Sequence, residues 1–170
     1  ALEEITIGKY NYGGLFLRMP WKKGITGEVV NGARQKNQRP EGQRAHWVDV
    51  GMQVEGRDDL AHITIFDHPK NSGFPQPWRV DGQMGVGPVR ARLGDWQIKK
   101  GEKATIRHQL VVHTGKLNDL SLTNRWSEWS GQRGTSALWG LAQQEGRSAE
   151  FLTPEKAVET MSIQEGFEVN

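Results

Sequence analysis

Apolar and polar residues alternate along much of the chain up to residue 113. The alternation is clearest in segments 45–50, 60–66 and 104–113, and shorter apolar runs occupy 14–19, 27–30 and 94–98. Because successive side chains of a strand point to opposite faces, a period of two predicts β-strands in these segments. Frequent glycine and proline breaks favour antiparallel connections. The sequence therefore predicts a mainly β protein, an antiparallel β-sandwich.

The same alternation predicts which side chains share a strand face. It groups Trp47 with Asp49, then residues 60, 62, 64 and 66, and then residues 107, 109, 111 and 113. Residues 31–44 are polar and without a pattern, so a long exposed loop is expected there. A turn at Lys99–Glu102 predicts a hairpin that leads into the strand at 104–113.

The period changes after Gly115. Leu122, Trp126 and Trp129 are spaced as on one face of a helix, and core packing is expected for both tryptophans. A polar stretch follows, and Thr153 with Pro154 then has the form of a helix start. The predicted organisation is a sandwich domain at 1–130, a linker at 131–153 and the start of a following domain at 154–170. The last segment is short but ends on apolar residues.

Composition narrows the classes of function. The chain has 170 residues, 22 Lys+Arg against 20 Asp+Glu, and no Cys. This balance gives no electrostatic footprint for nucleic acid. The absence of Cys excludes disulfides and a thiol nucleophile, and no apolar stretch is long enough for a membrane span. The seven Trp are either core residues or a flat stacking surface.

The most distinctive block is 66–78, which leaves a strand and enters a loop that contains three prolines. Asp67 and His68 fit an orienting carboxylate and an imidazole for acid–base chemistry. In the alternative interpretation, Asp67 caps the turn and His68 satisfies loop carbonyls, with aromatic residues packed beneath them.

The five histidines lack the short spacings of a metal site. His108 and His113 lie five positions apart, so they point to opposite faces of a strand. A zinc or copper centre would require His46, His62, His68 or His113 to converge by folding. No metal ligand and no cofactor are therefore expected.

A saccharide site is the third possibility, because proteins hold sugar rings between aromatic faces and polar edges. Trp47 beside Asp49 is the best such pair, and Trp78 and Asn71 are further candidates. Core packing is the competing interpretation for these tryptophans.

Five segments carry a resemblance to a known family: Gly13–Arg18, Arg44–Asp49, Phe66–Asn71, Phe74–Trp78 and Leu110–His113. With them, residues 10–129 resemble the second half of the PmoA-like family, labelled "methane oxygenase PmoA". The resemblance implies a β-sandwich in secreted or periplasmic bacterial proteins, often near carbohydrate-utilisation enzymes. The family's upstream His-Pro-His-His-Arg half is lacking, and the oxygenase activity in its label is not carried over.

A shorter resemblance covers the tail. Residues 153–157 and 166–170 resemble the start of the "membrane-bound dehydrogenase" propeller domain. It implies neighbouring propeller or haem-c domains in the same protein.

The expected function is an accessory carbohydrate-binding module of a larger periplasmic or secreted protein. Trp47, Asp49, Asn71 and Trp78 would bind the saccharide. The alternative is an enzyme that acts on a sugar or oxidised sugar, in which His68 or His113 is the acid or base and Asp67 orients it. A structural spacer without a ligand is the third hypothesis. Exposed sheet edges would be covered by neighbouring domains or by a partner chain.

Overall fold

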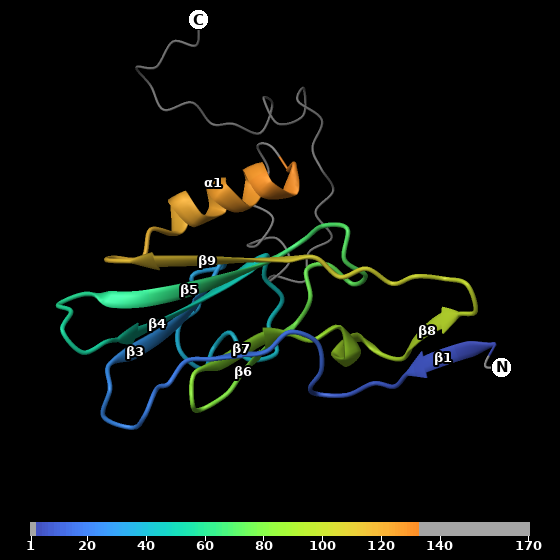
Figure 1. Cartoon of the computed structure of the whole chain (residues 1–170), viewed down its shortest axis with the longest axis horizontal. Coiled ribbons are helices and arrows are strands. Elements are labelled where there is room, and N and C mark those ends of the chain that lie inside the picture. Colours follow the sequence, from blue (N-terminus) through green and yellow to red (C-terminus); the bar gives the residue numbers. More distant parts are fainter. Residues whose placement is uncertain (1–2, 133–170) are drawn as a thin grey trace, which may run out of the picture.

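The structure is a computed structural model, and it describes residues 3–132. Within this range the chain forms short strands, one 3-10 helix and one α-helix (Figure 1). They are β1 (Glu4–Ile7), β2 (Leu17–Arg18), β3 (Gly27–Asn31), β4 (Trp47–Gln53), β5 (Leu60–Asp67), β6 (Trp78–Val80), β7 (Gly85–Pro88), η1 (Arg90–Leu93), β8 (Trp96–Lys99), β9 (His108–Thr114) and α1 (Asp119–Ser130).

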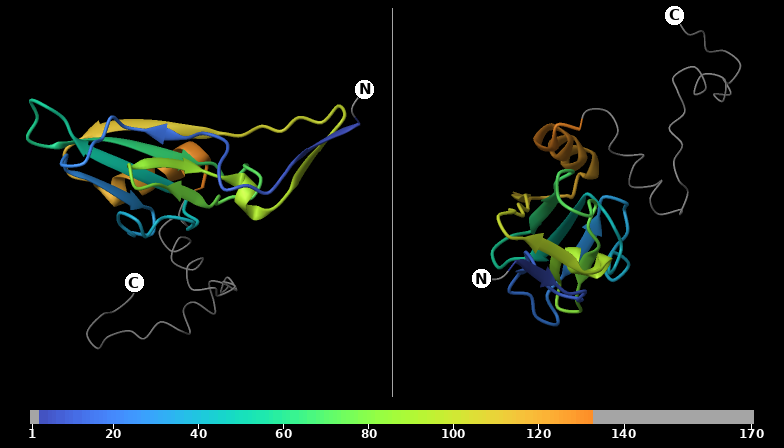
Figure 2. Two further views of the ribbon diagram at one scale, coloured as in Figure 1. Left: turned by 90° about the horizontal axis from the view of Figure 1, so that it is seen from below. Right: turned by 90° about the vertical axis from the view of Figure 1, so that its right-hand side faces the viewer.

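The strands of the described range form three antiparallel sheets. Their orders are β3-β4-β5-β9, β2-β7-β6 and β1-β8. The three-stranded sheet lies on one face of the four-stranded sheet, and α1 lies on the other (Figures 1 and 2). The β1-β8 ribbon extends away from this body. The predicted antiparallel β-sandwich is confirmed, with α1 as an additional layer.

Alternation along the strands divides the core in two. Val48, Val50 and Ile65 of the four-stranded sheet pack against Trp78 and Val86 of the three-stranded sheet. The opposite face of the same strands packs against α1, through Trp47, Phe66, Val111, Leu122 and Trp126. β4 is therefore covered on both faces, and all of its residues except the last are buried.

The helix α1 has clear local reasons for its bounds. The Asn118 side chain accepts a hydrogen bond from the backbone N–H of Ser121 and caps the first turn. Gly131 adopts the left-handed conformation that ends the helix (φ 73°). The predicted helical face is confirmed: Trp126 stacks on Phe74, with ring centroids 6.0 Å apart. Its indole N–H donates to the carbonyl of Asp67 at 2.7 Å.

The predicted hairpin and the predicted loop need correction, and some of the predicted segments lie outside the described residues. The turn at Lys99–Glu102 does not join two paired strands, because β8 pairs with β1 and β9 pairs with β5. The expected long exposed loop at 31–44 begins with Asn31, which is buried and is the last residue of β3. The predicted following domain and all of the predicted linker beyond Gln132 lie outside the described residues. None of the described helices has the length and apolarity to cross a bilayer.

Replacing Trp126 tests the helix layer. Trp126→Ala should lower the free energy of unfolding by roughly 3–5 kcal/mol, because it removes a buried ring and a buried hydrogen bond. Leu120→Ala on the same helix is the matched control, since Leu120 is 62% exposed. Urea unfolding followed by circular dichroism measures both. Equal effects of the two substitutions would show that α1 is not held by this face.

Candidate functional site

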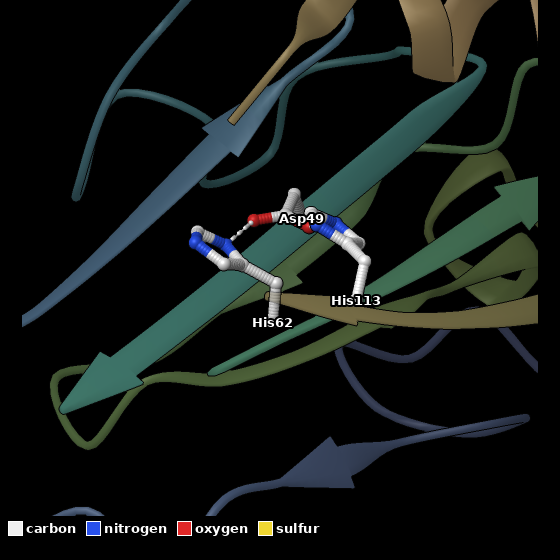
Figure 3. A group of neighbouring side chains, drawn as sticks. All are labelled: Asp49, His62 and His113. Carbon is white, nitrogen blue, oxygen red and sulfur yellow. Dashed lines mark hydrogen bonds and ion pairs between the residues drawn. The ribbon is translucent and has the colours of Figure 1, made fainter. Parts of the chain in front are cut away.

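Three polar side chains meet on the face of the four-stranded sheet that carries α1. Asp49 lies on β4, His62 on β5 and His113 on β9 (Figure 3). The strand register brings them together: Asp49 pairs with Thr64, and His62 pairs with His113. Within residues 3–132 this is the one group of three metal-ligating side chains, and its ligand atoms lie within 4.8 Å of one another.

The Asp49 carboxylate is the centre of the cluster. Its Oδ1 is 2.7 Å from Nδ1 of His62, and its Oδ2 is 2.9 Å from Nε2 of His113. The hydroxyl of Thr64 donates to Oδ2 at 2.6 Å. Asp49 is completely buried (0% exposed). Burial opposes ionisation, but the hydrogen bonds from His113, His62 and Thr64 outweigh it and lower the pKa of Asp49.

His62 faces an acceptor at both ring nitrogens. Nδ1 faces the Asp49 carboxylate, and Nε2 lies 3.1 Å from the carbonyl of Gly115. Because neither partner can donate, His62 donates at both positions and is an imidazolium in this arrangement. Burial disfavours that charge, but Asp49 outweighs burial and raises the pKa of His62.

Close packing holds the two imidazoles in place. The rings of His62 and His113 stack with centroids 4.7 Å apart and planes 6° from parallel. Gly51 lies against His62, since a Cβ atom there would come within 2.4 Å of the ring. The His113 side chain keeps 23% of its surface exposed, whereas that of His62 keeps 1%. His113 is therefore the member of the cluster that solvent reaches.

A cavity of about 650 Å³ adjoins the cluster at the N-terminal end of α1. Its wall includes His62, Gly115, Leu60 and Leu117. This volume is in the range of small-molecule sites.

Asp67 and His68 form a different arrangement from the expected catalytic pair. The Asp67 carboxylate accepts from the backbone N–H groups of His68 and Gln76 and from the amide of Asn71. Nδ1 of His68 accepts from the backbone N–H of Lys70 at 3.0 Å. Asp67 thus organises the loop and does not contact the His68 ring through a hydrogen bond in the described structure. Burial raises the pKa of Asp67.

The third predicted catalytic residue lies elsewhere. His113 pairs with His62, whereas Asp67 pairs with His108 at the other end of β5. The structure therefore does not bring His113 together with Asp67 and His68. Catalytic roles for Asp67 and His68 stay predictions, and these two residues do not share a site with His113.

The predicted saccharide residues are also separated. Trp47 and Trp78 are completely buried, one in each core, so neither ring has a face on which a sugar could stack. Asn71 is buried and bridges Asp67 to the backbone at Arg107. Of the four, only Asp49 belongs to the polar cluster.

The fold and the cluster define an antiparallel β-sandwich with a buried two-histidine, one-carboxylate centre. The chain belongs to a family of unknown function, DUF6807, whose model matches residues 1–127. Neither a curated protein nor a solved structure matches it.

This family assignment corrects both expected resemblances. The matching family is not the PmoA-like family, and no propeller domain matches the tail. The shared motifs of residues 10–129 were therefore assigned to the wrong family. Carbohydrate binding and a periplasmic or secreted location stay predictions.

The sequence indicated His62 only as one of four histidines that would have to converge for a metal centre, and it gave no sign of Thr64 as a member of the site. Alternation placed both on one strand face, and Asp49 and His113 each on another. The missing information was which strands are neighbours, because the ligands come from three strands and not from a short motif.

A separate buried histidine gives a pH-dependent prediction. His46 packs against Trp126 of α1, with ring centroids 4.6 Å apart, and burial lowers its pKa to about 4. Between pH 6.5 and 4 the His46 imidazole is protonated in the unfolded chain but stays neutral in the folded chain. The free energy of unfolding should therefore fall by about 3 kcal/mol between pH 6.5 and 4 on account of His46.

Urea unfolding at a series of pH values measures this dependence. His46→Phe should flatten the slope between pH 6.5 and 4, because the titrating group is gone. Leu120→Ala should leave the slope unchanged. A slope in His46→Phe that runs parallel to that of the unmodified chain would contradict the prediction.

Proposed function

We propose that this domain binds one divalent transition-metal ion through Asp49, His62 and His113, and that it is a metal-dependent enzyme. The observation that carries the proposal is the convergence of two imidazoles on one buried carboxylate. Imidazole and carboxylate together suit zinc and iron among the common metals. Two histidines with one carboxylate are a frequent catalytic set for both.

The hydrogen bonds assign the ligand atoms. His62 would coordinate through Nδ1 after that nitrogen loses its proton, while its Nε2–H stays on the Gly115 carbonyl. A backbone carbonyl in this position fixes the ring of a metal-bound histidine. His113 would coordinate through Nε2. Thr64 would orient the Asp49 carboxylate through its hydroxyl, as hydrogen-bond partners of metal ligands do.

The ligand atoms lie within 4.8 Å of one another, so they must shift to share one ion. Metal–nitrogen bonds of ~2.0–2.1 Å place neighbouring donor atoms of a tetrahedral site about 3.3 Å apart. The hydrogen-bonded atoms are 2.7 and 2.9 Å apart, so each pair opens by about half an ångström. An ion with charge +2 also replaces the proton that now neutralises the buried carboxylate.

The number of ligands supports catalysis over a structural role. Structural zinc sites are closed by four protein groups, whereas catalytic sites keep a position for water or substrate. The cluster supplies three groups, and His113 lies partly exposed. Water on the ion would be activated as a nucleophile, or a substrate oxygen would be polarised.

A second candidate function uses the same residues without metal. The buried carboxylate of Asp49 orients the imidazole of His113, and this arrangement suits a general base or acid. It retains His113 from the enzyme alternative, but with Asp49 in the orienting role expected of Asp67. Chelators distinguish the two functions, because only the first requires an ion.

Cobalt titration tests the metal proposal. Co²⁺ added to the metal-free chain should produce d–d absorption that saturates at one ion per chain, and Zn²⁺ should abolish it by competition. His113→Ala should lose this absorption. Thr64→Val should weaken the affinity roughly 10–100-fold, since it removes the hydrogen bond that positions Asp49.

His68→Gln is the matched control, because His68 is a buried histidine outside the cluster. It should bind Co²⁺ as the unmodified chain does. An absence of stoichiometric binding in the correctly folded chain would refute the metal proposal and leave the acid–base alternative. Binding that survives His113→Ala would place the ion elsewhere.

A further inference from the structure

The outer face of the three-stranded sheet carries exposed aromatic and polar side chains. Trp78, Val80 and Val86 point into the core between the sheets. Alternation therefore directs Arg79, and its cross-strand partner Gly87, to the outside. This face lies on the far side of the sandwich from α1 and the Asp49 cluster (Figure 2).

Two glycines of β7 leave space for an aromatic ring on this face. Gly85 and Gly87 of β7 lie beneath the ring of Phe16, which is 43% exposed. A Cβ at Gly85 would come within 2.5 Å of that ring, and one at Gly87 within 2.2 Å of the Leu15 carbonyl. The glycines therefore allow Phe16 to lie against the sheet backbone.

Two tyrosines extend the aromatic surface. Tyr10 is 63% exposed and Tyr12 is 51% exposed, and their ring centroids are 5.5 Å apart. The guanidinium of Arg79 lies 5.2 Å from the Tyr12 centroid. Hydrogen bonds to the 3-10 helix hold this segment, through the Tyr10 N–H and the Asn11 carbonyl. These hydrogen bonds fix the segment that carries the two tyrosine rings.

Both guanidiniums of this face contact a carboxylate. Arg18 forms an ion pair with Asp81, and Arg79 forms one with Glu41 at 3.1 Å. Arg18 also donates to the amide oxygen of Gln83 at 2.8 Å. Glu41 also forms an ion pair with Arg92 at 2.7 Å, so this carboxylate serves two guanidiniums. The face therefore offers planar hydrogen-bonding groups that ion pairs hold in place.

We propose that Tyr10, Tyr12 and Phe16, with the guanidiniums of Arg18 and Arg79, form a binding surface for a neutral saccharide. The C–H groups of a pyranose ring carry partial positive charge, and they match the negative face of an aromatic ring. The surrounding guanidinium, carboxylate and amide groups provide donors and acceptors for the hydroxyls. Because both guanidiniums already contact a carboxylate, the surface favours neutral over acidic sugars.

This surface goes beyond the proposed metal centre and is independent of it. It restores the carbohydrate expectation at other residues, since Trp47 and Trp78 are buried. Exposed apolar side chains that gather in one patch often mark a binding site.

Affinity electrophoresis of the 170-residue chain tests the proposal. Native gels would contain xylan, galactomannan, hydroxyethylcellulose or polygalacturonate. At least one neutral polysaccharide should retard the protein, and Tyr12→Ala and Phe16→Ala should each reduce that retardation. Leu110→Ala, which removes a similarly exposed apolar side chain on β9, is the matched control and should have no effect.

The metal centre is separated from this test by one further gel. Retardation should persist in the presence of EDTA, because the surface needs no ion. Absence of retardation by every neutral polysaccharide would overturn the proposal. So would retardation that survives Tyr12→Ala and Phe16→Ala, or retardation by polygalacturonate alone.

Discussion

A single buried carboxylate determines how the candidate site is built. Asp49 is fully removed from water, and its charge is stable only because His62, His113 and Thr64 direct hydrogen bonds at it. These partners come from two other strands, so the charge of one residue depends on the register of β5 against β4 and of β9 against β5. Removing one partner would leave the buried charge only partly compensated. Because the buried carboxylate needs a positive charge beside it, the cluster also suits a metal cation, which would bind the carboxylate and both imidazoles at once.

Much of the fold could be predicted from alternation. The strands at 45–50 and 60–66 were expected close to β4 and β5, and the grouping of Trp47 with Asp49 is what the structure shows. The helical face with Leu122 and Trp126 was also predicted correctly. Strand order was not predictable, because β1 pairs with β8 across most of the described chain, and local turn residues carry no information about such a partner. The expected hairpin at Lys99–Glu102 failed for this reason.

The site was predicted only in part, and the reason is physical. Asp49 and His113 were both singled out, but with separate roles, because they lie far apart in the chain. The strand between them, β5, brings them within 2.9 Å of each other and adds His62 and Thr64 to the site. Asp67 and His68 are adjacent in sequence, yet the loop backbone uses the Asp67 carboxylate and leaves no hydrogen bond to the neighbouring ring. The tryptophans chosen for a sugar fill the two cores, whereas the exposed rings belong to tyrosines and a phenylalanine near the N-terminus.

Anomalous diffraction at the zinc edge, from crystals of the chain grown with Zn²⁺, tests the central claim most directly. The account predicts one strong peak bonded to the Asp49 carboxylate, Nδ1 of His62 and Nε2 of His113, with Thr64 still donating to the carboxylate. An intact set of carboxylate–imidazole hydrogen bonds, with no peak between these groups, would contradict it. The cluster would then be a buried polar network that joins three strands.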